Sequence, residues 1–164
     1  MPLSERATIG YADREDRIKI LAEIPGGATI VLWLTQRLAN KLIPHLTSRL
    51  PNQAPNERLL RRESESDAPE TEVVPVQEAL VVSTFVVDSV DISETGSLTL
   101  LQFRSDDDRE GLPAVRVALD VSQLASWLHA LRACYQKASW NQSPWAALND
   151  RDYVEATPSN FTVH

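Results

Sequence analysis

The sequence contains a single cysteine, Cys134, among its 164 residues. One cysteine cannot form an internal disulfide, and it does not supply the paired thiolates of a structural metal site. This usage is typical of a protein that folds in a reducing compartment. The first residues also lack the apolar segment of a secretory signal, so the sequence predicts a cytoplasmic location.

Long apolar runs and positive charge are also scarce. No run approaches the ~20 apolar residues that span a bilayer, which predicts no membrane insertion. Lys and Arg number 16 against 23 Asp and Glu, giving a formal net charge of −7 that repels phosphate backbones. The one basic cluster, Arg58 with Arg61 and Arg62, is followed at once by acidic residues. We therefore expect no nucleic-acid partner.

Only five glycines are present, and none forms a phosphate-binding loop or a nucleophile elbow. The three consecutive aspartates 106–108 lack the alternating spacing of a calcium loop. His45 and His129 have no Cys, Asp or Glu at ligand spacing. Cys134 lies among apolar residues near the end of a predicted helix and is interpreted as a buried structural thiol. The sequence thus predicts no cofactor, no metal and no catalytic residue.

Hydrophobic residues make up 43% of the chain and charged residues 24%, which is ordinary for a globular protein with a real core. Residues 17–24 alternate apolar and polar side chains, which indicates a half-buried strand. Pro25-Gly26-Gly27 favours a tight turn, and residues 28–34 form the second strand of a hairpin. Here Ile30, Leu32 and Leu34 share one face, while Val31 and Trp33 make the opposite face apolar too.

Two amphipathic helices follow strands directly. The first has Thr35 as its predicted N-cap and a stripe of apolar residues at spacings of three and four that runs to Leu50. Pro44 is expected to kink this helix or to split it near residues 42–43. The second has Asp120 as its N-cap, with Gln123 completing a capping box, and a stripe that runs to Ala138.

The remaining segments complete the predicted order of elements. Residues 51–75 are rich in Pro, Glu and Ser and are expected to be a disordered linker between two halves. Strands are predicted at 80–87, extending as far as Ile92, and at 98–103 and 115–119. The two halves resemble each other around their helices, which fits either a repeat or two helices with similar packing needs. The tail 141–164 contains aromatic residues without a clear period.

These segments predict an α+β fold in a single domain, 1–164. The fold is a mainly antiparallel sheet of about five strands with two amphipathic helices, in the order ββα-βββα. The helices are expected to share one face of the sheet. The other face, with Leu21 beside Val31 and Trp33, then needs a cover, which is either a partner or the chain's own tail through Trp140 and Trp145. We predict these five residues as interface residues.

The expected function is a non-enzymatic protein–protein interaction module, an adaptor or assembly subunit that forms a homodimer. Two alternatives stay open at this point. One is a dedicated chaperone for a protein partner. The other is a small-molecule-binding protein or enzyme with a pocket between sheet and helices, because carboxylate pairs in a cleft come together only in the fold.

Overall fold

The structure is a computed structural model that describes residues 3–4, 6–50, 80–106, 114–146 and 160–163. The predicted linker 51–75 lies outside the described residues, as do residues 107–113 and 147–159. The described elements are, in order, β1 (Arg6–Ala12), β2 (Arg17–Ile24), β3 (Ala28–Leu34), α1 (Gln36–Thr47), β4 (Val81–Val86), β5 (Ser89–Thr95), β6 (Leu98–Arg104), β7 (Val115–Leu119), α3 (Val121–Ala138), the 3-10 helix η2 (Ser143–Trp145) and β8 (Asn160–Val163).

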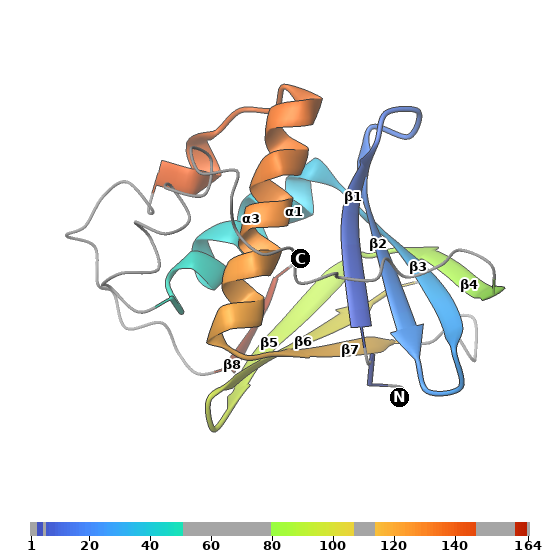
Figure 1. Ribbon diagram of the computed structural model, residues 1–164. Helices are drawn as coiled ribbons and strands as arrows, with labels where there is room; N and C mark the ends of the chain where they lie inside the picture. The colour runs from blue at the N-terminus through green and yellow to red at the C-terminus, as the bar shows by residue number, and fades with distance from the viewer. Residues whose placement is uncertain (1–2, 5, 51–79, 107–113, 147–159, 164) are drawn as a thin grey trace, which may run out of the picture.

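The strands form two four-stranded sheets, ordered β1-β2-β3-β4 and β7-β6-β5-β8. Every pair is antiparallel except β3 with β4. The strands of the two sheets cross at a large angle, and both α-helices lie on the same side of the molecule (Figure 1). The predicted α+β class, with a mainly antiparallel arrangement and two amphipathic helices, is confirmed.

The predicted hairpin and both helix caps are present. Gly26 and Gly27 have φ values of 96° and 81°, which glycine adopts without strain, and they reverse the chain between β2 and β3. The Thr35 hydroxyl accepts a hydrogen bond from the Leu38 amide at 3.3 Å. Asp120 and Gln123 exchange side-chain and backbone bonds at 2.8 and 2.9 Å, which is the capping box. Local sequence signals therefore set the starts of both helices.

Pro44 does not split the first helix, so one of the two expected outcomes, a break near residues 42–43, does not occur. Helix α1 runs without interruption from Gln36 to Thr47, with Pro44 inside it. Proline has no backbone N–H group, so the helix has one hydrogen bond fewer at this position. The buried side chains on both sides of it, Ile43 and Leu46, are fully removed from solvent and hold the last turn against the core. Packing of the apolar stripe thus outweighs the one lost bond.

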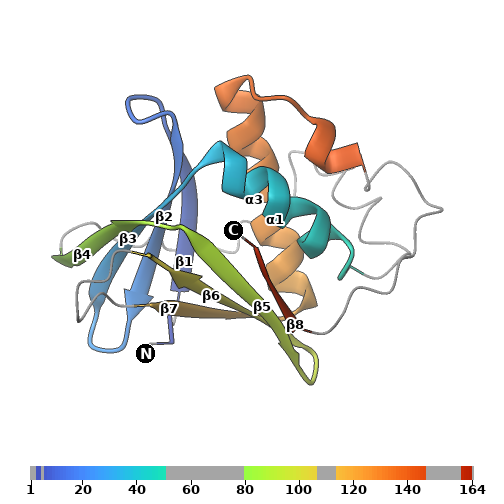
Figure 2. The same cartoon turned by 180° about the vertical axis from the view of Figure 1, so that it is seen from behind.

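The predicted long strand at 80–92 is divided between the two sheets. Within it, the Val87 amide donates to the Trp33 carbonyl oxygen at 2.9 Å, while the next amide, that of Asp88, donates to the Arg104 carbonyl at 2.9 Å. Consecutive residues therefore bond to different sheets, and the chain passes directly from β4 into β5 (Figure 2). Because the chain leaves the first sheet and enters the second at this point, the strands form two sheets and not the single sheet expected from the sequence.

Each half of the chain contains three antiparallel strands followed by a helix, β1-β2-β3-α1 and β5-β6-β7-α3. The fourth strand differs between the halves. In the first sheet β4 adds parallel to β3, and in the second sheet β8 adds antiparallel to β5. The resemblance seen around the two helices therefore extends to the strands before them, but not to the strand that completes each sheet.

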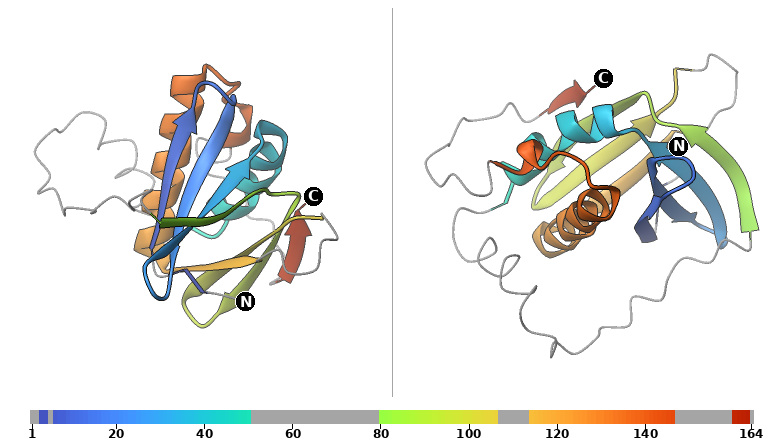
Figure 3. Two further views of the ribbon diagram at one scale, coloured as in Figure 1. Left: turned by 90° about the vertical axis from the view of Figure 1, so that its right-hand side faces the viewer. Right: turned by 90° about the horizontal axis from the view of Figure 1, so that it is seen from above.

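Both sheets and both helices contribute to one cluster of buried apolar side chains. Helix α3 lies alongside β1 and also contacts β6 and β7, and α1 contacts α3 and η2 (Figure 3). The inner face of the first sheet supplies Ile18, Ile20 and Leu32, all without exposed surface. Neither helix in the described part of the chain is both long and apolar enough to cross a bilayer.

Candidate functional site

The outer face of the first sheet carries an apolar group of side chains on β2, β3 and β4. Leu21 is the direct cross-strand neighbour of Val31, and Trp33 pairs with Val86 on its other side. We call these four residues the Trp33 face. Val31 is buried, and the other three are half-buried. The structure thus brings together three of the predicted interface residues, Leu21, Val31 and Trp33.

Neighbouring side chains hold the indole of Trp33 in place. Its Nε1 atom donates a hydrogen bond to the Thr84 hydroxyl at 3.0 Å, which ties β3 to β4 at the surface. The Lys19 ammonium lies 5.8 Å from the ring centroid on the other side, within the range of a cation–π contact. A tryptophan fixed in this way offers a rigid apolar surface with little conformational freedom left to lose on binding.

The corresponding outer face of the second sheet is mainly polar, although it also carries Leu98 and Leu100. Asp91 and Arg104 form an ion pair at 2.8 Å there. Gln102 and Arg116 are paired on the same face of β6 and β7. A face of this kind is suited to contact with water. The two sheets therefore differ in the chemistry of their outer faces, and the apolar one is the face that the sequence analysis singled out.

Strand β4 extends the apolar surface to the edge of the first sheet. Leu80 and Val82 each keep 62% of their surface exposed, and Val81 keeps 45%. Three consecutive exposed aliphatic residues are unusual beside a half-buried tryptophan. Sequence reasoning identified this segment as a strand but did not place it at an edge, so it missed Val82, Thr84 and Val86 as surface residues. The β-branched, uncharged run was the available signal.

Trp140 and Trp145 lie elsewhere, in the core beside the helices. Trp145 is 1% exposed, and its ring meets that of Tyr135 edge-on with 5.6 Å between centroids. Trp140 meets Tyr135 at 5.2 Å and Tyr11 at 5.7 Å. Of the two sequence-based alternatives for this part of the tail, the placement matches the one in which the tryptophans complete the protein's own core.

Two short hydrogen-bond chains anchor this aromatic cluster. Asp16 accepts from the Tyr11 hydroxyl at 2.5 Å and from Trp140 Nε1 at 3.2 Å. The bond to Asp16 raises the pKa of Tyr11 to about 12. Tyr135 donates to Asn40 at 2.5 Å, and burial raises the pKa of its phenol. Both tyrosines are therefore held neutral. The hydrogen bonds to Asp16 tie the β1–β2 turn to Tyr11 and Trp140, and the bond from Tyr135 to Asn40 ties α3 to α1.

The two histidines singled out in the sequence lie on different helices, His45 on α1 and His129 on α3. Burial lowers the pKa of His45, and Arg49 adds to the effect, while His129 is exposed on α3. In the described segments, no group of three or more His, Cys, Asp or Glu side chains is placed to hold a metal ion. Asp88 accepts bonds from the Ser105 hydroxyl at 3.2 Å and the Asp106 amide at 2.8 Å, which gives that carboxylate a structural role.

We predict that Cys134 is unreactive in the folded protein. Its side chain is 5% exposed, and burial raises its pKa from 9.0 to about 11. At pH 8 about one molecule in a thousand then carries the thiolate that attacks a disulfide reagent. Labelling with an aromatic disulfide reagent should be slow in buffer and fast in concentrated urea. Rapid stoichiometric labelling of the native protein at pH 8 would contradict the buried position.

The same shift sets the sign of a pH effect. The folded state favours the neutral thiol, so its contribution to stability is fully present below the unfolded pKa of 9.0 and is lost as the pH rises through about 11. A Cys134→Ala variant is the control, because it should lose less stability over that alkaline interval than the natural chain does.

Comparisons with protein-family models, with curated proteins and with solved structures found no match to this chain.

Proposed function

We propose that this protein is a non-enzymatic interaction module, an adaptor or assembly subunit, and that the Trp33 face is its docking surface. The observation that carries the proposal is the apolar character of this outer face, with Trp33 at its centre and exposed aliphatic residues at the adjoining edge. The partner is a protein surface with a complementary apolar patch, either a second copy of this chain or another protein.

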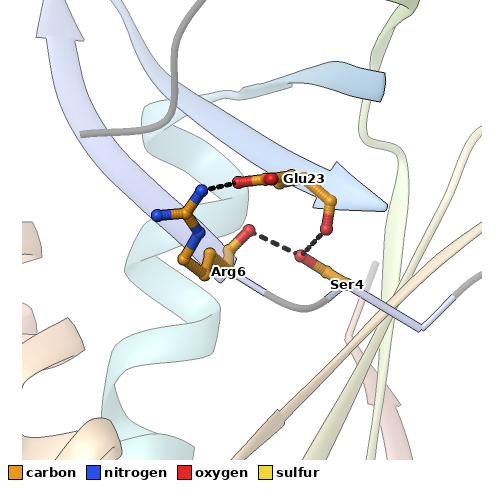
Figure 4. A network of polar contacts seen from close by, with 3 residues as sticks. All are labelled: Ser4, Arg6 and Glu23. Carbon is orange, nitrogen blue, oxygen red and sulfur yellow. Dashed lines mark hydrogen bonds and ion pairs between the residues drawn. The ribbon is translucent and has the colours of Figure 1, made fainter. Parts of the chain in front are cut away.

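The composition of the face supports a protein partner. Protein interfaces combine a few rigid aromatic and aliphatic anchors with a polar rim, and tryptophan is the residue type most enriched among energetic hot spots. Lys19 and Glu23 on β2 and Arg6 on β1 supply such a rim. Arg6 and Glu23 form an ion pair, so the rim is held in place before binding (Figure 4).

The charge distribution supports the same reading. The chain carries a net charge of −7, yet neither β3 nor β4 contains a charged residue. Charges at the centre of an interface must be desolvated, and they are depleted there in known complexes. A neutral, apolar region within an acidic protein therefore favours contact with another protein over contact with a nucleic acid or with a charged small molecule.

We predict that Trp33→Glu abolishes the complexes that the natural protein forms. The substitution places a carboxylate at the centre of the face, where it would be desolvated without a partner charge. Loss of a central tryptophan typically costs 2 kcal/mol or more of binding energy, roughly 30-fold in affinity. Complexes can be measured by cross-linking the tagged protein in its host and by light scattering on the purified chain.

The matched control is Gln102→Glu, which adds the same charge to the outer face of the second sheet. Thermal unfolding should show both variants folded. The proposal predicts that the same complexes persist with Gln102→Glu and disappear with Trp33→Glu. If both variants retain every complex of the natural protein, the Trp33 face is not the docking surface.

A further inference from the structure

Each sheet ends in strands whose outer backbone groups need a cover, and in the described residues two of the four edges have a recognisable one, while a third strand is short. Strand β1 has helix α3 alongside it. The outer edge of β7 pairs with the N-terminal segment, because Leu3 bridges to Arg116 and the Ser4 amide donates to the Arg116 carbonyl at 2.7 Å. The Ser4 hydroxyl fixes that segment by sharing its one proton between the carbonyl oxygens of Arg6 and Glu23, at 2.7 and 3.1 Å (Figure 4). Strand β8 is only four residues long.

Strand β4 is the fourth edge, and it differs from the others. Within the described ranges its only paired neighbour is β3, so among those residues the N–H and C=O groups on its other side have no strand partner. Its sequence, VVSTFV, contains none of the charged residues or prolines by which proteins normally protect an edge from pairing. An uncharged edge with exposed valines is a template for one more strand.

We infer that β4 pairs antiparallel with β4 of a second copy of this chain, so that the two first sheets join into one continuous sheet in a two-fold dimer. The inference deepens the proposed function and rests on it, since strand pairing would be the way in which this module assembles. The backbone edge supplies the hydrogen bonds, and the exposed side chains of Val81 and Val82 supply apolar surface to bury across the seam.

A second copy is favoured over an unrelated strand because β4 is compatible with itself. Two-fold antiparallel pairing centred on Val82 places Val82 directly opposite its own counterpart and Val81 opposite Ser83, and like charges in such positions are destabilising. Neither β4 nor its neighbour β3 contains a charged residue. Two copies of β4 can therefore pair without repulsion between like charges in these strands, although the chain as a whole is acidic.

The pairing also connects with the Trp33 face. Trp33 reaches β4 through its hydrogen bond to Thr84, and Val86 lies beside it on the same outer face. Joining two β4 strands would bring the Trp33 faces of both copies together as one broader apolar surface. A closed two-fold pairing uses both edges at once and leaves no free edge for further growth, which predicts a dimer and not a filament.

The experiment is a charge exchange at Val82 in the full-length protein, measured by light scattering at up to about 100 µM, where a micromolar interface is saturated. Val82 is 62% exposed, so its replacement does not disturb the core. The natural chain and the Val82→Thr control should be dimers. Val82→Lys and Val82→Glu should each weaken self-association at least about tenfold, and an equal mixture of the two should restore a dimer.

Three results would overturn the inference: a monomeric natural chain at the highest concentration, a dimer unaffected by Val82→Lys, or charged variants that fail to pair when mixed although each is folded by circular dichroism.

The proposed function is tested separately. If the natural chain is monomeric but Trp33→Glu still removes complexes with other proteins, strand pairing is wrong and the docking face stands. If strand pairing holds while Trp33→Glu changes nothing, the docking face is wrong.

Discussion

Replacing Leu42 by alanine is expected to lower the free energy of unfolding by about 2–5 kcal/mol. Leu42 lies in the middle of the α1 stripe and has no exposed surface. Its removal both loses apolar burial and leaves a cavity that the surrounding side chains cannot fully close. The same cost is expected for Leu128→Ala in α3, whose side chain is 1% exposed. Urea denaturation monitored by tryptophan fluorescence measures both losses.

Lys41→Ala is the matched control for Leu42→Ala, because Lys41 is the preceding residue of the same helix and its side chain is exposed. Its effect should remain within about 0.5 kcal/mol, since no buried contact is removed. A loss below about 1 kcal/mol for both leucine variants would mean that the two helical stripes do not form the core described for this fold.

Trp145→Ala should cost about 3–5 kcal/mol, although Trp145 lies in a tail without regular periodicity. The ring is 1% exposed and packs edge-on against Tyr135, and η2 lies against α1. Trp145 is the largest fully buried side chain among the described residues, so its removal leaves a large cavity. The variant separates the two roles open to this tryptophan, since an exposed interface residue would cost the isolated chain much less.

Trp145→Phe is the informative control for that variant. Among the described residues the buried indole Nε1 has no hydrogen-bond partner, so phenylalanine keeps an aromatic ring while removing a donor that this part of the chain leaves unsatisfied. The loss should therefore stay below about 1.5 kcal/mol, well short of the alanine value. Equal losses for Trp145→Phe and Trp145→Ala would show that the packing around this ring is not what stabilises the tail.

The sequence predicted part of the candidate site, the Trp33 face. Alternation with a period of two placed Leu21, Val31 and Trp33 on one face of a hairpin, and the observed register pairs Leu21 with Val31 directly. The edge could not be recovered, because the position of a strand within a sheet depends on which distant segments pair with it. Nothing within residues 80–87 encodes that β3 is its neighbour or that the described residues leave its other side unpaired.

The sequence by itself determined the elements that rest on local rules: the hairpin at Gly26 and Gly27, the caps at Thr35 and Asp120, and the two apolar stripes. Helix starts, turns and side-chain periodicity depend on residues a few positions apart. Only the tertiary structure decided the division of residues 80–95 between two sheets, the pairing of β8 with β5, and the burial of Trp140 and Trp145. Those outcomes depend on hydrogen bonds and contacts between segments far apart in the chain, such as the consecutive amides of Val87 and Asp88 that bond to Trp33 in one sheet and Arg104 in the other.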